Sequence, residues 1–372
     1  MRYKLGEICE IVSGSTPKTS IPEYWDGDVK WITPAELNDD SYIINDSVRK
    51  ITELGVKKTG LSPFPVGTVI LSSRAPIGKV AIAGCEMYCN QGFKNLICSD
   101  IINNRYLFWF LKGNTEYLNS LGRGATFKEI SKQIVSSIVI NVPSIEEQKK
   151  AVGVLEQVSG IIKMRKQELQ VLDELIKARF VELFGDRYIN DKTWPSRKLG
   201  DCISFNNGKA HEQVVDETGE YILVTSRAIA SDFLDVRRTN ALLFPLHKND
   251  IVMVMSDVPN GRALAKCQLI DEDEKYTLNQ RICSFDNYDY NPIFLLYLLN
   301  RHQYFLDFDD GNSQTNLRKN DILGCNLINP PMELQDRFAE FVKQVDKSKV
   351  AVQAALDKAQ LLFDSLMQEY FE

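Results

Sequence analysis

The sequence has no long apolar run. None of its 372 residues lies in an apolar stretch of about 18 residues, the length that a membrane span needs. The N-terminal segment that ends at Glu7 has no apolar signal region. We therefore expect a cytoplasmic protein without a membrane segment.

Histidine is scarce, and cysteine is not spaced for metal binding. There are three histidines, and none of the eight cysteines forms a Cys-x-x-Cys pair. The closest two, Cys85 and Cys89, have no histidine beside them. Structural zinc sites need clustered ligands, so we expect no metal in this chain and interpret the cysteines as free thiols in a reducing compartment.

The motifs of nucleotide hydrolysis, DNA cleavage and methyl transfer are also missing. There is no Walker loop, and the acidic stretch 271–275 is interpreted as a turn. Asn329-Pro-Pro-Met332 resembles the Asn-Pro-Pro-aromatic motif of amino-methyltransferases, but Met332 cannot stack on a flipped base as an aromatic ring does. We interpret these prolines as a helix start and expect no catalytic residue.

The chain has little excess charge, with a net value of −6. Residues 1–144 hold 16 Lys and Arg against 14 Asp and Glu, whereas residues 185–331 hold 16 against 21. Bulk charge constrains solubility and association rate rather than the chemistry of one face. If nucleic acid is the partner, the basic residues must be concentrated on one face of the protein.

A 40-residue segment is duplicated: residues 145–184 align with 332–371 without a gap, and neither copy contains proline. An alternation of charged and apolar residues predicts one long amphipathic helix per copy, each about 60 Å long. The apolar positions recur at intervals of seven, which is typical of a coiled-coil seam and predicts that the helices pair. These positions are Leu155, Ile162, Leu169, Ile176 and Leu183, and then Val342, Leu356, Phe363 and Tyr370, with Lys349 interrupting the second series.

The segments between these helices repeat more loosely. Each begins with Lys-Leu-Gly and an acidic residue, continues through a strand-like run into a Gly-containing loop, and later has an Asn-Gln pair and an apolar helix. Each ends with a short apolar strand and a proline, which is a favourable start for a helix. We therefore predict an α+β protein with two similar domains, residues 1–144 and 185–331, each followed by a long helix, 145–184 and 332–372. Residues 185–197 are predicted to be a linker.

This ordered pattern resembles the DNA-recognition (specificity) subunit of type I restriction-modification systems over essentially the full chain. The resemblance is carried by the Lys-Leu-Gly-Glu/Asp starts, the Gly-x-x-x-Thr loops at 122–126 and 311–315, the Pro-x-x-x-x-Gln helix starts, and the 178–186 segment with Trp194 downstream. The chain is short for the family. Leu334 stands where the first copy has Glu147, and Lys349 interrupts the seam.

The resemblance implies two target-recognition domains held apart by two antiparallel spacer helices. Each domain would read one half of a split double-stranded DNA site, with half-sites about one helical turn apart. The helices, through the seven-residue series above, would bind two methyltransferase (modification) subunits that use S-adenosylmethionine. Separate restriction subunits would use ATP and Mg²⁺, so this chain would need no cofactor of its own.

A DNA reader needs Arg for guanine, Asn or Gln for adenine, and cations and hydroxyls for phosphates. These residue types gather in the Gly-containing loops. In the first domain we expect DNA contacts from Ser13, Ser15, Thr16, Lys18, Ser73, Arg74, Lys79, Asn90, Gln91, Lys94, Arg123, Thr126 and Lys128. In the second we expect them from Asn207, Lys209, His211, Ser226, Arg227, Asn260, Arg262, Asn279, Gln280, Arg281, Asn312, Gln314, Thr315 and Arg318.

Three other interpretations stay open from the sequence. Each of these residues could instead be a solvated loop residue, a turn-former or, for Asn-Gln, an internal hydrogen-bonding pair. The chain could be a self-contained DNA methyltransferase, in which case it would bind S-adenosylmethionine. It could also be a protein-interaction scaffold without a DNA role, in which case replacement of its loop arginines would leave its interactions unchanged.

Overall fold

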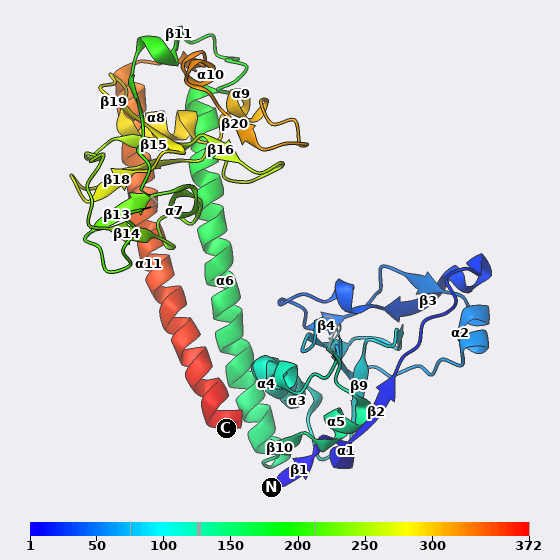
Figure 1. Cartoon of the computed structure of the whole chain (residues 1–372). Coiled ribbons are helices and arrows are strands. Elements are labelled where there is room, and N and C mark those ends of the chain that lie inside the picture. The colour runs from blue at the N-terminus through cyan, green and yellow to red at the C-terminus, as the bar shows by residue number, and fades with distance from the viewer. Residues whose placement is uncertain (75, 125–127, 212, 372) are drawn as a thin grey trace. The chain divides into compact units, whose positions relative to one another are not determined.

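The computed structural model describes residues 1–74, 76–124, 128–211 and 213–371 (Figure 1). Their contacts divide the chain into two compact units. The first unit contains residues 1–166 and the chain from residue 354 onward, and the second contains residues 167–353. Each long helix therefore contributes one part to each unit.

The first unit is built on a five-stranded sheet, β2-β9-β6-β7-β4, and a three-stranded sheet, β5-β3-β8. Its strands are β1 (Arg2–Lys4), β2 (Cys9–Ser13), β3 (Trp25–Ile32), β4 (Ile43–Ile44), β5 (Lys50–Ile51), β6 (Val69–Leu71), β7 (Val80–Ala83), β8 (Tyr88–Cys89), β9 (Lys94–Cys98) and β10 (Val139–Asn141). Its short helices are α1 (Leu5–Ile8), η1 (Pro22–Tyr24), η2 (Pro34–Glu36), α2 (Glu53–Thr59), α3 (Asn104–Gly113), α4 (Thr115–Ser120) and α5 (Lys132–Ser137).

The second unit has a four-stranded sheet, β12-β19-β15-β17, and a three-stranded sheet, β14-β13-β18. Its strands are β11 (Ser196–Lys198), β12 (Ser204–Asn207), β13 (Tyr221–Val224), β14 (Arg237–Thr239), β15 (Ile251–Val254), β16 (Ser256–Asp257), β17 (Cys267–Leu269), β18 (Tyr276–Leu278), β19 (Ile282–Asp286), β20 (Thr315–Asn316) and β21 (Asn326–Ile328). Its short helices are η3 (Leu199–Asp201), α7 (Ser226–Ala230), α8 (Pro292–Leu299), α9 (Gln303–Leu306) and α10 (Lys319–Leu323).

The two units share one strand topology. The antiparallel series β2-β9-β6-β7 corresponds to β12-β19-β15-β17, and the parallel pair β3–β8 corresponds to β13–β18. Each unit also pairs its first strand with its last, β1 with β10 and β11 with β21. The predicted α+β class with an internal repeat is confirmed.

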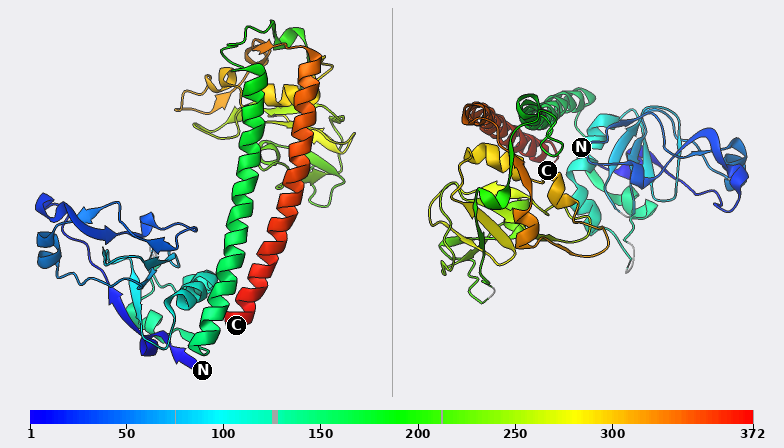
Figure 2. Two further views of the ribbon diagram at one scale, coloured as in Figure 1. Left: turned by 180° about the vertical axis from the view of Figure 1, so that it is seen from behind. Right: turned by 90° about the horizontal axis from the view of Figure 1, so that it is seen from above.

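Both predicted long helices are present, α6 (Ile145–Phe184) and α11 (Met332–Phe371), each as one unbroken coil (Figure 1). Within the second unit they pack side by side and antiparallel (Figure 2). The ring of Phe184 lies 5.7 Å from that of Phe338, and Lys349 forms an ion pair with Asp173, 11 residues before Phe184. Lys349 is thus accommodated in the apolar series by a partner on the facing helix. A coiled coil along the whole length stays a prediction.

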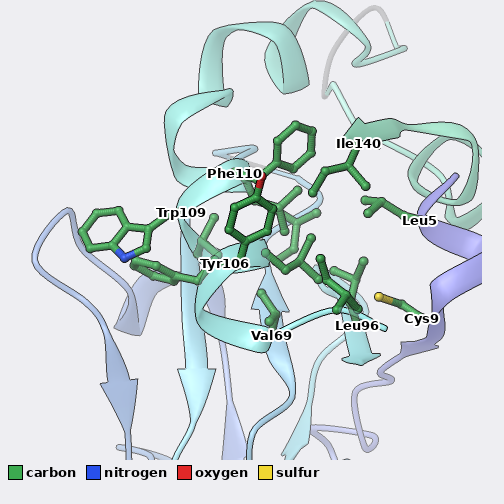
Figure 3. Packing of buried hydrophobic residues seen from close by; sticks show 14 of the residues in the cluster. Leu5, Cys9, Val69, Leu96, Tyr106, Trp109, Phe110 and Ile140 are labelled. Atoms are coloured by element: carbon green, nitrogen blue, oxygen red, sulfur yellow. The ribbon is translucent and has the colours of Figure 1, made fainter. Parts of the chain in front are cut away.

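Helix α3 covers the large sheet of the first unit. Figure 3 shows Tyr106 of this helix above Val69 and Leu96 of the sheet. On the other side of α3, the ring of Trp109 meets that of Phe363 of α11 at 5.5 Å. The last turns of α11 therefore complete the core of the first unit, and burial of this apolar surface ties the helix to the domain.

The Pro-x-x-x-x-Gln helix starts have the same structural role in both units. Gln148 is fully buried; it donates to the carbonyl of the proline five residues earlier at 2.9 Å and accepts from the N–H of Asn103 at 2.8 Å. Gln335 makes the equivalent bonds at 2.8 and 2.9 Å, the second from the N–H of Asn291. Asn103 and Asn291 are the N-caps of α3 and α8. The glutamine therefore fixes the start of α6 against the start of α3, and the start of α11 against that of α8.

Residues 185–197, predicted to be a linker, are bound to the second unit. The Arg187 guanidinium donates to four backbone carbonyls at the end of α8, those of residues 297, 298, 300 and 301. The indole N–H of Trp194 donates to the carbonyl of Phe184 at 3.0 Å. Since the last carbonyls of a helix have no partner within it, Arg187 serves as a C-terminal cap.

His302 is a buried histidine that caps α9. It is 2% exposed, and its Nδ1 accepts from the N–H of Tyr304 at 3.2 Å, which places the proton of the neutral ring on Nε2. Burial, together with the positive charge of Arg187, lowers the pKa of His302 from 6.5 to about 4. The folded chain therefore keeps this ring neutral where the unfolded chain would protonate it.

We expect the second unit to lose stability as the pH falls from about 6.5 to about 4. In this window the unfolded state binds a proton on residue 302 that the folded state does not bind, which removes up to about 3 kcal/mol. His302→Asn can still cap the helix but does not titrate. Denaturant unfolding at pH 7 and pH 4.5 should show a smaller loss for this variant, and equal losses would contradict the prediction.

Candidate nucleic-acid interface

The antiparallel sheet brings three predicted loops of the first unit to one edge. Strand β9 pairs with both β2 and β6, so the ends of β2 and β6 and the start of β9 lie together. The described residues of the loops at this edge are 13–18, 73–74, 76–79 and 90–94. These loops are far apart in the sequence, and the alternating direction of the strands brings them together.

Hydrogen bonds join these loops to one another and to the late loop. The Thr16 hydroxyl bonds to the Gln91 side chain. The N–H of Ser73 donates to the Gly92 carbonyl at 2.7 Å, and the Ser73 carbonyl accepts from the N–H of Ile130 at 2.9 Å. The four polar loops that the sequence singled out therefore form one cluster.

The second unit assembles its loops through equivalent bonds. The N–H of Lys209 donates to the Leu278 carbonyl at 3.0 Å. The N–H of Met255 donates to the Arg281 carbonyl at 3.3 Å, and the Met255 carbonyl accepts from the N–H of Leu317 at 2.8 Å. Met255 thus occupies the place of Ser73. The same framework presents two different sets of side chains.

One glycine in each unit makes this contact possible. A Cβ on Gly14 would lie 2.0 Å from the Cys89 carbonyl oxygen, and a Cβ on Gly208 would lie 2.1 Å from that of Asn279. No side chain fits at that distance from backbone. The glycine of the first loop is therefore required for that loop to rest against the Asn-Gln turn.

The predicted residues of the first unit differ in accessibility. Thr126 lies outside the described residues. Exposed at the cluster are Ser13, Lys18, Gln91, Arg123 and Lys128, and half-buried are Ser15, Thr16, Arg74, Lys79 and Asn90. The backbone of Arg123 pairs with Glu129 in both directions, at 3.0 and 2.9 Å, so the loop is anchored while the guanidinium points to solvent.

Three of these side chains serve internal bonds. Ser73 is fully buried and accepts from the ammonium of Lys94, itself 6% exposed, at 3.2 Å. The Lys79 ammonium donates to the carbonyls of Pro34 and Leu37. A buried, satisfied polar group would have to break these bonds to reach a phosphate. We therefore retain the exposed and the other half-buried residues, not these three, as candidates for DNA contact.

The second unit exposes more of its predicted residues. Exposed are Asn207, Lys209, Arg227, Asn260, Arg262, Gln280, Arg281, Asn312, Gln314 and Arg318, and half-buried are Ser226 and Asn279. His211 is 1% exposed and bonds to the Lys209 carbonyl and the Thr277 hydroxyl, and Thr315 is 7% exposed and bonds to Asp309. His211 and Thr315 hold the loops in place rather than present a polar group outward.

Carboxylates of the second unit stabilise its loops. Asp257 accepts from the N–H groups of Ala263 and Leu264 at 2.7 and 3.1 Å, and Asp309 accepts from that of Asn260 at 3.1 Å. Backbone hydrogen bonds to Asp310 lower the pKa of that carboxyl group. Part of the acidic excess of this unit thus acts within the loops, where it stabilises their backbone.

Glu129 is a residue of the cluster that the sequence analysis missed. Its carboxylate lies 3.2 Å from the Lys94 ammonium and 3.9 Å from the Arg74 guanidinium. With Arg123 it lines an open hollow of about 660 Å³, together with Ser131, Gln133, Ile134 and Ser137. Its place after the Gly-containing loop is a signal in the sequence, but a carboxylate is not among the residue types expected to contact DNA.

The seven-residue series of the long helices faces inward. Leu155, Ile176 and Val342 are buried, and Ile162, Leu169, Leu183, Leu356, Phe363 and Tyr370 are half-buried. Leu155, Phe363 and Tyr370 join the core of the first unit, and Ile176, Leu183 and Val342 join that of the second. A partner subunit would therefore have to contact another side of the helices.

Within the described ranges, no group of His, Cys, Asp and Glu is arranged to hold a metal ion. In the same ranges no helix combines the length and the apolar character of a membrane span.

Comparison with known proteins gives one consistent result. Residues 1–174 and 191–359 match the family model described as type I restriction modification DNA specificity domain. The type I restriction enzyme MjaIX specificity subunit of Methanocaldococcus jannaschii is 28% identical, with 98% of this chain and 90% of the relative covered. The MjaVIII specificity subunit of the same organism is 23% identical, with 92% and 85% covered.

Two solved structures share the fold. The S subunit of the type I restriction-modification system from M. genitalium has a TM-score of 0.59 at 15% identity, with 100% of this chain and 96% of that chain covered. A chain from a study of complex assembly and conformational transition of the type I R-M system has a TM-score of 0.63 at 16% identity, with 100% and 97% covered.

Proposed function

Because the chain belongs to the family of type I restriction-modification DNA specificity subunits, we propose that its two domains read the two halves of one split double-stranded DNA site. The subunit is the non-catalytic, DNA-recognising component of such systems. On this proposal it acts in the cytoplasm, together with two methyltransferase subunits that bind S-adenosylmethionine and restriction subunits that use ATP and Mg²⁺.

One observation carries the proposal: the same framework of loops occurs twice, with different polar side chains on it. Met255 repeats the backbone bonds of Ser73, and Gly208 repeats the close approach of Gly14. A duplicated scaffold that presents unlike donors and acceptors suits a protein that reads two unlike short sequences. It is not expected of a scaffold that binds one partner.

A gel-shift series tests this proposal. The chain alone is expected to bind DNA weakly and with strong dependence on salt, because much of the phosphate contact would come from partner subunits. Addition of methyltransferase subunits is expected to give tight binding to a split sequence. A full complex without preference for any split sequence would refute the proposal.

The long helices are proposed to dock the methyltransferase subunits through their exposed apolar side chains. In the first unit Ile161 and Met164 of α6 are 42% and 60% exposed, and in the second unit Val171 and Leu175 are 65% and 44% exposed. Val171 and Leu175 are four residues apart and so lie on one helix face. Apolar groups at this spacing, left open by the chain's own domains, are typical of a helix that a partner covers.

Placing two aspartates at Val171 and Leu175 is expected to weaken assembly with the methyltransferase subunits roughly tenfold or more, because a partner would have to bury both charges. Since both side chains are exposed, the unfolding midpoint of the chain should change little. Lys166→Gln with Gln170→Asp changes the net charge by the same amount at exposed positions on another face of the same helix and is the control. Equal assembly of both double variants, measured by analytical gel filtration, would exclude this docking face.

A further inference from the structure

Arg74, Lys94 and Glu129 form a charged group in the loop cluster of the first unit. The Glu129 carboxylate is shared: Oε1 lies 3.2 Å from the Lys94 ammonium and Oε2 lies 3.9 Å from Nη1 of Arg74. The Lys94 side chain is 8% exposed, whereas those of Arg74 and Glu129 are 35% and 40% exposed. A buried cation therefore holds a carboxylate that still faces solvent.

The geometry leaves bonding capacity on both exposed groups. A separation of 3.9 Å is too long for a hydrogen bond, so Arg74 and Glu129 lie side by side without satisfying each other. Lys94 occupies Oε1 and leaves lone pairs on Oε2. Two adjacent groups thus offer a guanidinium fork of donors and a carboxylate acceptor.

The second unit has no such group at the equivalent positions. The bridge between Arg74 and Glu129 corresponds to the pair Ser256–Asn316, because the neighbouring residues make the same bonds in both units. Lys94 pairs across the sheet with Ser13, just before Gly14, and Cys283 pairs with Asn207, just before Gly208. The framework is shared, and these three positions differ together.

We propose that Arg74 and Glu129 together read one G·C base pair in the half-site of the first domain. In the major groove this pair presents two acceptors on guanine, N7 and O6, and one donor on cytosine, the N4 amine. Arg74 would donate to guanine and Glu129 would accept from cytosine. Lys94 is a positioning residue that fixes the carboxylate. With Ser256 and Asn316 at these places, the second domain lacks this charged readout.

The inference rests on the proposed function, and its test separates the two. The full chain, in complex with its methyltransferase subunits, is used to select binding sequences from random double-stranded DNA. The wild-type complex is expected to select a split site with a G·C pair in the half that the first domain reads. A wild-type complex without any split preference would refute the proposed function itself.

Two variants then test the inference. Glu129→Gln keeps an acceptor for Lys94 but loses the charge, and Arg74→Ala removes a half-buried side chain. Each is expected to reduce discrimination at the same G·C pair roughly tenfold to hundredfold and to leave the other half-site unchanged. Glu10→Gln removes the same charge from the exposed face of β2 and is expected to change no position.

Failure takes three recognisable forms while the wild-type complex still selects a split site. The first half-site contains no G·C pair, the two variants relax different base pairs, or neither variant relaxes any. Each of these results would overturn the assignment of Arg74 and Glu129 and leave the proposed function standing.

Discussion

A chain that carries both Arg123→Ala and Arg281→Ala is expected to bind its DNA site roughly a hundredfold or more weakly, while its assembly with methyltransferase subunits is unchanged. Both arginines are exposed in the loop clusters, and their backbones are held by Glu129 and Met255. Arg→Ala removes the side chain beyond Cβ, guanidinium included, and leaves these backbone bonds in place. Each arginine that reads guanine contributes about 1–3 kcal/mol, and effects at distant sites add.

The single variants make this prediction specific. Arg123→Ala should relax one half of the selected site and Arg281→Ala the other, as measured by sequence selection with the full complex. The control is Lys248→Ala, an exposed cation that precedes β15 and so lies at the opposite end of this strand from the loops that follow it. If a single variant loses affinity but keeps its sequence preference at both half-sites, that arginine contacts only phosphate.

Replacement of Arg187 by methionine is expected to destabilise the second unit by about 3–5 kcal/mol. Four carbonyls at the end of α8 would lose a charged donor in a half-buried setting where no neighbouring helical N–H can replace it. Denaturant unfolding of the full chain would show an early transition for this unit.

Two other variants control for the change of residue type. Arg187→Lys keeps the charge but offers a point donor in place of the planar fork, so an intermediate loss is expected. Arg237→Met changes an exposed arginine of β14 and should cost little. If Arg187→Met unfolded at the same denaturant concentration as Arg237→Met, the cap would have no energetic role.

Much of the architecture was predictable because the sequence contains an internal repeat. The ungapped repeat of 145–184 in 332–371 predicted both long helices, and the apolar helix predicted in each half corresponds to α3 and α8. Glycines and Asn-Gln pairs in matching order predicted the loops. Because the same motifs occur in the same order in both halves, each half supports the prediction made for the other. A single short motif gives no such support.

The accessibility of single side chains was not predictable. Lys94 follows a polar turn and was expected at the surface, yet the sheet places its ammonium between Ser73 and Glu129. His211 is similar, because its partner Thr277 lies 66 residues away in sequence. Such burial depends on which strand lies beside which, and local composition does not record that.

The seven-residue series shows the same limit. It predicted a contact face, and Leu155, Ile176 and Val342 are indeed buried, but within the chain's own domains. Periodicity identifies the apolar side of a helix without identifying what covers it. Val171 and Leu175 do not belong to the series. Only the structure shows that they are exposed, and this exposure makes them candidates for partner contact.

The most direct test of two independent DNA-recognition domains is a domain exchange followed by mapping of the methylated sequence. Residues 1–144 are replaced by the corresponding domain of a family member with a known, different site, and the complex with methyltransferase subunits modifies random DNA. The account predicts two short specified blocks, of which one changes and the other is retained. A single continuous block, or a change in both blocks, would contradict it.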